Sequence, residues 1–561
     1  MTTRIHREYF KRETADVAKF VDALKENGSK NGTFDSVGTE DFISQVTNAS
    51  VETTGVKIPQ GLQHVFDEAG KDEKIAVTKA ILDSCDSYEK NHGCEAPADL
   101  IETAIHSAFS TTQFARDHFK VFDSAADSLH AANTSLQPNR AVVAIITTIA
   151  EAIPFAHYLP ADISSNEARL AILTHRAGTT YGAYAQNDVL DGVASGDPYI
   201  TSSRVHTMNP GSDGTVKGKL TKTQTDGDTC NQSGDAVKLL RGRTMVYVDG
   251  RIAAREIDST GSGNSSVSGN ITIGDTNYAI GGTINTDTGE ISLTTTPNMP
   301  QTCKVVVEGF IDYERAPELT PSIISAVDTY RLYAKPWRVL TRQTIDTRTQ
   351  MANELGLDPY SESIVAMQAQ FGNERHYDAL RKGMRLAQMN TEVFDFAQAI
   401  SHQDVQRAEA WRDLSYPLGV VSQRMAELTM NHGVTHLYVG KRVAAQLMAM
   451  PSTVFQPAGI AARPGIYRLG RLFGQYEVYY TPKVIKETAD SSQILCVGRA
   501  TDVTRNPIVL GDAVAPMVVP LGVMGDLRQG AAFYARNFTE VNPHDASSKG
   551  FALIDVTNLA G

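Results

Sequence analysis

Residues 356–387 read GLDPYSESIVAMQAQFGNERHYDALRKGMRLA, and this stretch decides how the second half of the chain is organised. Asp358 followed by Pro359 is a typical helix start, with an N-cap side chain and a proline at the first helical position. No proline interrupts the stretch before Thr391. It therefore predicts one helix of about 30 residues, roughly 45 Å long.

One face of this predicted helix is apolar. Its core positions are Ile364, Met367, Phe371 and Leu380. Gly372 and Gly383 are expected to weaken the helix locally. A helix of this length in a mid-sized domain usually serves as a strut, and the apolar repeat is too short for a coiled coil. We expect the first three of these residues to pack against a sheet, as core and assembly positions.

The chain after this helix predicts short helices and strands in mixed order. Residues 411–432 form an amphipathic pattern with a break at Pro417 and Gly433 as the stop. Further elements are expected at 434–439, 441–450, 466–480, 493–497, 516–519, 530–534 and 551–556. They alternate in type without regular βαβ units, which indicates an α+β fold.

Residues 201–312 have a different composition, in which Gly, Thr, Ser, Asn and Asp separate short β runs. The runs lie at 243–248, 270–273, 291–294 and 304–310. Asp249-Gly250 and the Gly-containing triplets 261–263 and 287–289 are turn signals. The triplet at 261–263 lacks the third glycine of a dinucleotide-binding loop, so it predicts a hairpin. The pattern favours a small β sandwich or barrel, inserted at the surface.

Residues 1–135 are acidic, with 22 Asp and Glu against 15 Lys and Arg up to Arg140. Segments 74–86 and 100–118 have the apolar spacing of amphipathic helices. This region therefore predicts a helical subdomain. Residues 136–200 are rich in aromatics and turn formers, as expected of an extended arm.

The composition of the 561 residues is that of a globular protein of three or four domains, with 41% hydrophobic and 21% charged residues. A net charge of −12 argues against nucleic-acid binding by the chain as a whole. The polar start has no secretory pattern, and the longest apolar run, 141–156, is too short for a membrane span. We expect a soluble, intracellular protein in a reducing compartment, because five scattered cysteines indicate no disulfide framework: Cys85, Cys94, Cys230, Cys303 and Cys496.

Candidate chemical sites are few. His432 and His436 have metal-ligand spacing, but Gly433 between them ends the expected helix, so a structural role is favoured. Cys85 and Cys94 lie too far apart for a zinc knuckle, and no second ligand pair follows. The chain has no Walker loop, nucleophile elbow or kinase signature. We therefore expect no catalytic, cofactor-binding or metal-binding residues, and not an enzyme.

The order of motifs from Pro317 onward resembles the major capsid proteins of large tailed bacteriophages, of the HK97-like fold and the T-even-like type. It runs from PELTPSIISAVDTYRLYAKPW at 317–337 to the Gly-Leu-Asp helix start. VTHLYVGKRVAAQL at 434–447 and PGIYRLGRLFGQYEVYYTP at 464–482 are similar to the axial domain of that family. The long helix matches the spine of the family's peripheral domain.

The resemblance implies a domain layout. It comprises an extra N-terminal helical region (1–135), an N-arm with the start of the extended loop (136–200), the inserted β domain (201–312), a peripheral domain with the spine helix (313–432), an axial domain (433–510) and strands returning to the peripheral domain (511–561).

The implied function is that of a structural subunit. Copies of the chain would assemble into hexamers and pentamers of an icosahedral capsid around double-stranded DNA, without sequence-specific binding. Expected partners are other copies, with decoration, portal and scaffold proteins, and no membrane and no cofactor. The expected location is the virion capsid, assembled in the cytoplasm of the host bacterium. No lysine–asparagine pairing supports the covalent cross-links of some relatives.

Two alternatives remain. One is an encapsulin-like cellular compartment shell, which would need a cargo-binding site rather than a large insertion. The other is a carbohydrate-binding or hydrolytic protein acting through the β insertion, which would need clustered aromatics or paired carboxylates. Residues 201–303 offer only Tyr247 and Tyr278 as aromatics.

Many members of the resembled family lose an N-terminal segment by proteolysis after a hydrophobic-x-Glu site. Leu24-Lys25-Glu26 and Leu100-Ile101-Glu102 match that loose pattern. The helical periodicity of 74–118 favours packed helices over a disposable segment. We therefore predict that the region is retained, clamped to neighbouring subunits with its acidic face in solvent.

Overall fold

The computed structural model describes residues 15–27, 29–30, 33–48, 56–59, 62–63, 66, 70–108, 142, 144–161, 165–224, 234–355, 359–400, 407–521 and 528–559. The chain forms two compact units. The first unit combines Met1–Ile172 with Thr329–Gly561, and the second is Leu173–Asp328. Helices and strands are mixed throughout the first unit, as the α+β prediction requires.

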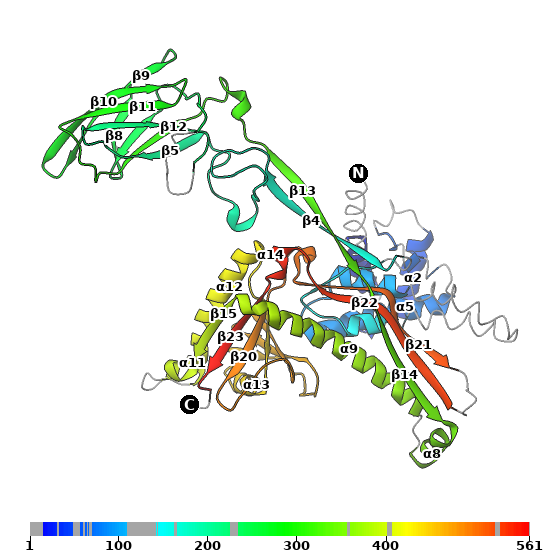
Figure 1. The fold of residues 1–561 in the computed structure, drawn as a ribbon. Coiled ribbons are helices and arrows are strands. Elements are labelled where there is room, and N and C mark those ends of the chain that lie inside the picture. The colour runs from blue at the N-terminus through cyan, green and yellow to red at the C-terminus, as the bar shows by residue number, and fades with distance from the viewer. Residues whose placement is uncertain are drawn as a thin grey trace. The chain divides into compact units, whose positions relative to one another are not determined.

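A four-stranded sheet in the order β14-β22-β21-β3 forms one part of the first unit. Its strands are β3 (Ala156–Tyr158), β14 (Lys335–Thr344), β21 (Ile508–Leu521) and β22 (Arg528–Val541). Helix α9 (Pro359–Leu386) runs along this sheet, with α8 (Ile345–Leu355) at one end (Figure 1). The helix is 28 residues, hence about 42 Å, long, so the prediction of a single long helix is confirmed. Its expected cap at Asp358 lies outside the described residues.

A seven-stranded sheet in the order β15-β23-β20-β16-β19-β18-β17 forms the other part. Its strands are β15 (Thr391–Asp395), β16 (His436–Val439), β17 (Phe455–Pro457), β18 (Tyr467–Leu472), β19 (Tyr476–Tyr480), β20 (Ser492–Val497) and β23 (Phe551–Thr557). The associated helices are η3 (Ala387–Met389), α10 (Phe396–Ile400), α11 (Arg407–Asp413), α12 (Ser415–Thr429), α13 (Lys441–Met448), η4 (Val503–Arg505) and α14 (Asp545–Ser548). A core around the fully buried Trp411 joins α11 and α12 to this sheet.

The pairing of the strands corrects several of the domain boundaries predicted from the sequence. Residues 511–561 do not return to one sheet, because β23 pairs with β15 and β20 while β22 pairs with β14 and β21. Helix α12 packs with the seven-stranded sheet, so 432 is not a boundary between two cores. That helix ends at Thr429 with Met430 in the left-handed conformation, which corrects the expected stop at Gly433. Pro417 lies inside its first turn, where a missing N–H costs little.

The N-terminal helices share a core with the rest of the first unit. They comprise 15–27, α2 (Ser36–Asn48), α5 (Lys71–His92), 98–108 and 144–150, with a short β1–β2 pair (Ser29–Lys30, Thr33–Phe34). The predicted helix at 100–118 is described only as far as residue 108. Leu24, Ile81 and Leu100 are fully buried in one cluster with residues of both sheets, including Leu495 and Leu510.

The second unit is built on an eight-stranded sheet in the order β5-β12-β7-β8-β9-β10-β11-β6. Its strands are β5 (Ser203–Met208), β6 (Thr215–Lys219), β7 (Met245–Val248), β8 (Arg251–Glu256), β9 (Asn264–Ile273), β10 (Thr276–Asn285), β11 (Glu290–Thr296) and β12 (Val305–Phe310). Asp249-Gly250 forms the tight β7–β8 turn with both residues at positive φ, as its sequence predicts. The end strands meet where Met208 packs against Gly218, so the sheet curls on itself.

The second unit is wider than the predicted insertion at 201–312. Tyr181, Tyr184 and Tyr199 from the expected arm are buried in its core. The Arg204 guanidinium lies 4.1 Å from the centre of the Tyr181 ring. The elements that flank the eight-stranded sheet are η1 (Gly192–Ala194), η2 (Pro317–Leu319) and a two-stranded sheet of β4 (Glu167–Ala177) and β13 (Ile323–Tyr333). The boundaries between the two units fall inside β4 and β13.

The first prediction concerns the independence of the second unit. Residues 173–328 expressed alone should fold, because their core is built within the unit. A cooperative thermal transition with β-type circular dichroism would support this. Deletion of only 203–301 from the full chain should leave an unfolded remnant of this unit, because it removes β5 and β7 and leaves β12 without either partner.

The second prediction concerns retention of the N-terminal region. Leu100 and Ile101 are buried within a helix, so a protease could reach the bond after Glu102 only by unfolding the shared core. Intact-mass spectrometry of protein from assembled particles should show a species near the full 60.8 kDa. A mature species beginning after Glu26 or Glu102 would overturn retention.

Candidate functional site

The first half of α9 packs on the four-stranded sheet. Met367 and Phe371 are buried in a cluster with Ala531, Phe533 and Ala535 of β22, and Ile364 packs against its margin. The Phe371 ring centre lies 5.1 Å from that of Phe533. The sequence-derived face therefore contacts a sheet, while its importance for assembly stays a prediction.

The second half of α9 packs elsewhere. Leu380 is fully buried in the core shared with the N-terminal helices and with β23. A Cβ added to Gly383 would lie 2.5 Å from the Phe551 ring, so glycine allows this strand to approach the helix closely. Gly383, expected only to weaken the helix, thus has a packing role. The four predicted residues of α9 divide between two cores.

A buried cation lies between the two halves of α9. Arg375 Nη2 is 3.0 Å from Asp512 Oδ1 of β21, and the two residues are 5% and 2% exposed. Burial raises the pKa of the nearby Glu151 carboxyl to about 8, against the opposing effect of Arg375. Arg375 therefore lies beside the Asp512 carboxyl group and near the Glu151 side chain, which is largely protonated at neutral pH. The sequence did not predict this triad, because its members are far apart in the chain.

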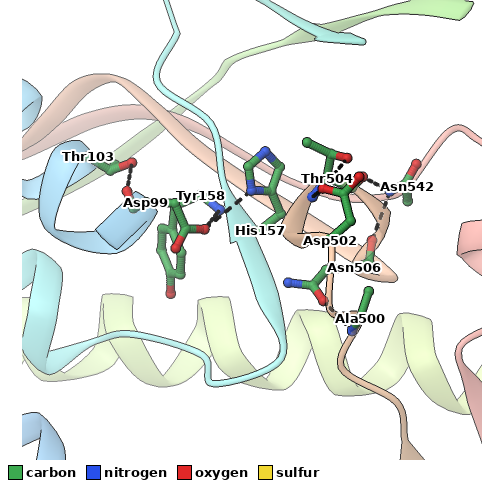
Figure 2. A network of polar contacts seen from close by, with 9 residues as sticks. All are labelled: Asp99, Thr103, His157, Tyr158, Ala500, Asp502, Thr504, Asn506 and Asn542. Atoms are coloured by element: carbon green, nitrogen blue, oxygen red, sulfur yellow. Dashed lines mark hydrogen bonds and ion pairs between the residues drawn. The ribbon is translucent and has the colours of Figure 1, made fainter. Parts of the chain in front are cut away.

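A polar network ties the N-terminal region to β3 (Figure 2). Asp99 Oδ2 accepts a hydrogen bond from the Tyr158 backbone N–H at 3.2 Å and lies 3.3 Å from His157 Nδ1. Nearby, Asn542 Nδ2 donates to the backbone carbonyls of Thr504 and Asn506 at 3.0 and 2.8 Å. These contacts fix loops and strand ends, which is a structural use of polar groups.

The histidines and cysteines singled out from the sequence do not converge on a metal. His432 lies in the loop after α12 and His436 begins β16. Burial lowers the pKa of His432 to about 4. Cys85 and Cys94 are free thiols. Among the described residues, no group of three or more His, Cys, Asp or Glu could hold a metal ion. In the same part of the chain, no helix is long and apolar enough to cross a membrane.

A polar groove of about 680 Å³ lies between α9 and residues of β14 and of the segments at 464–465 and 483. Its lining residues are Trp337, Gln370, Asn373, Glu374, Tyr377, Asp378, Arg381, Pro464, Gly465 and Lys483. The groove is lined by two acidic residues, Glu374 and Asp378, and by two basic residues, Arg381 and Lys483. Asp378 also forms an ion pair with Lys382 on the same helix, at 2.9 Å.

The strand β14 exposes apolar side chains at the edge of its sheet. Val339 and Leu340 are 48% and 49% exposed, and Ile345, directly after the strand, is 45% exposed. Only β22 pairs with β14, so its other edge carries backbone groups without a strand partner among the described residues. The sequence patterns did not predict this surface. The signal that could have identified this edge strand is Pro336, which lies three residues before the apolar pair at 339–340. Proline is tolerated mainly in edge strands.

No model of a protein family matches the chain, and no curated protein is similar to it in sequence. Solved structures do match. One is the icosahedrally averaged capsid of jumbo bacteriophage PhiKZ, at 8% identity over 72% of this chain and 91% of that chain, with a TM-score of 0.35.

Two further structures show a similar degree of likeness. The mature capsid of bacteriophage PhiM1 matches at 11% identity over 53% of this chain and 83% of that chain, with a TM-score of 0.28. The SrpI encapsulin complex from Synechococcus elongatus matches at 10% identity over 43% of this chain and 79% of that chain, with a TM-score of 0.27.

The third prediction tests the packing of α9. Met367→Asp places a carboxylate in an apolar cluster, which should cost about 3 kcal/mol or more of unfolding free energy. Val365→Asp, on the same helix but 61% exposed, is the matched control and should change stability by less than about 0.5 kcal/mol. Thermal or urea unfolding of the two variants measures the difference. Equal stability would show that Met367 is not a core position.

Proposed function

We propose that this chain is a structural subunit that assembles with copies of itself into a capsid-type shell. The observation that carries the proposal is the exposed apolar edge strand β14. An open edge strand with exposed apolar side chains offers its backbone groups and these side chains to another chain. In a shell subunit, the same edge is covered by a neighbour.

Other features of the first unit support this role. Helix α9 links two cores, so the unit resists deformation along the length of the helix. Exposed large apolar residues occur also away from β14, among them Val365 on α9 and Tyr416 on α12. A shell subunit makes contacts on several sides at once, since each copy has several neighbours.

The finer proposal follows the resemblance in the sequence. Copies would form hexamers and pentamers of an icosahedral virion capsid around double-stranded DNA, assembled in the host bacterial cytoplasm. Portal, scaffold and decoration proteins would be further partners. A role without enzymatic activity and the T-even-like type both belong to this proposal.

An encapsulin-like shell is the second candidate, because it would use the same exposed edge. A carbohydrate-binding role of the β unit is less well supported. Tyr278 is buried, and the Tyr247 hydroxyl donates to Glu308 Oε2 at 2.9 Å, which removes both rings from use as an open stacking platform.

The proposal is tested by negative-stain electron microscopy of the purified protein. Closed particles, tubes or ring-shaped capsomers would support a shell subunit. A monomer at high concentration, across a range of salt and crowding conditions, would refute it. Nucleic-acid analysis of particles from an infected host separates a virion capsid from a cellular compartment.

The fourth prediction concerns the edge strand. Leu340→Lys should block assembly, because a charge replaces an apolar contact, while monomer stability changes by less than about 0.5 kcal/mol. Ile257→Lys, in the second unit and 63% exposed, is the matched control and should assemble normally. Light scattering after size-exclusion chromatography reports assembly. Wild-type assembly by Leu340→Lys would remove β14 from the contact surface.

A further inference from the structure

A cluster of aromatic and imidazole rings joins α5 to the seven-stranded sheet and to α9. We call it the histidine–tyrosine cluster; its members are His92 of α5, His376 of α9, His436 and Tyr438 of β16, and Tyr479 of β19. The Tyr438 and Tyr479 rings stack with centres 5.3 Å apart, and both residues are at most 2% exposed. His436 is 5% exposed, whereas His92 and His376 lie at the partly buried rim.

Each imidazole of the cluster has a hydroxyl group within hydrogen-bonding distance, and a neutral ring can form that hydrogen bond. His92 Nδ1 lies 3.0 Å from the Tyr479 hydroxyl, and His376 Nε2 lies 3.2 Å from the Tyr438 hydroxyl. His436 Nδ1 lies 2.7 Å from Thr435 Oγ1. A hydroxyl can donate to the free lone pair of a neutral imidazole, so no member needs a charge to complete its hydrogen bond.

The surroundings disfavour positive charge in this cluster. The groups that face it from the packed elements are Tyr88 and Cys94 near the end of α5, Tyr158 of β3, Arg463 and Arg468 at β18, Glu477 of β19 and Arg499 after β20. Three are guanidinium groups. The single carboxylate, Glu477, is already held by Arg468 at 2.5 Å and by Arg471. Burial raises the pKa of Tyr88 and Cys94, so both stay neutral in acid.

We propose that the histidine–tyrosine cluster is an acid-sensitive joint, whose protonation opens the contact between α5 and the seven-stranded sheet. Three imidazoles in one cluster cannot all take up protons beside three arginines without strong repulsion. Opening lets each ring reach water, where its charge is solvated. The inference concerns the chain itself and does not rest on the proposed function.

The direction of the pH dependence follows from the histidine pKa values. Burial lowers the pKa of His92 to about 4 and that of His376 and His436 to about 3. A solvent-exposed histidine has a pKa near 6.5. Below that pH the open form binds more protons than the closed form, so the joint loses stability as pH falls from about 6.5 towards 3–4. Above about pH 6.5 the histidines are neutral in both forms, so protonation no longer reduces the stability of the joint.

Hydrogen–deuterium exchange across pH tests the proposal, with protection factors corrected for the intrinsic exchange rate. Protection of α5 should fall between about pH 6.5 and 4. The strands β9 and β10 of the second unit serve as an internal reference and should stay protected. Protection of α5 that persists unchanged to pH 3 would overturn the joint.

Isosteric variants assign the effect to the cluster. In His92→Asn, His376→Gln and His436→Asn, the amide replaces the bonded ring nitrogen without titrating. The triple variant should lower the pH midpoint for loss of α5 protection by roughly 1 unit or more. His432→Asn, a buried histidine outside the cluster, is the control and should leave the midpoint unchanged. If the triple variant does not fold at pH 8, His92→Asn alone, at the rim, should give a smaller shift of the same sign. An unshifted midpoint in the folded variants, or an equal shift in the control, would refute the assignment.

Discussion

The buried pair of Arg375 and Asp512 is the constraint on which the first unit depends. Before Arg375, α9 packs on the four-stranded sheet through Phe371; after it, Leu380 enters the core shared with the N-terminal helices. The helix can belong to both cores only if the guanidinium at their border is neutralised without water. Asp512 provides this charge, and a buried guanidinium left without it would cost about 3–5 kcal/mol. The pair therefore fixes the position of α9 relative to β21.

The edge strand β14 shows how an exposed apolar surface can be specific. Arg338 and Arg342 flank the exposed Leu340 at alternate positions, and neither makes an ion pair with a described residue. Charges on an edge strand suppress indiscriminate pairing, because a second strand must neutralise them before its backbone can bond. An edge with both apolar side chains and exposed arginines thus favours one complementary partner over general aggregation.

Local patterns were sufficient to predict the elements but not the way they combine. The long helix and the Asp249-Gly250 turn follow from periodicity and turn chemistry within a few residues. The 14-residue length of β21 was missed, because Pro516 and Pro520 argue against a central strand. Strand β3 pairs only with Ile508–Leu510, so both prolines lie in the part of β21 that has one neighbour. Which residues form a core depended on such long-range pairing, as did the triad around Arg375.

The same reasoning explains why a large β unit can be carried between β4 and β13. Ser203 and Phe310 pair across β5 and β12, so the eight-stranded part begins and ends at neighbouring positions. A segment whose ends meet can be added without separating the strands on either side of it. The first unit could not be interrupted in the same way within 70–108, where α5 and the following helix supply residues to its shared core. We therefore expect insertion to be tolerated where the chain closes on itself, and a segment to be retained where it shares a core with distant parts of the chain.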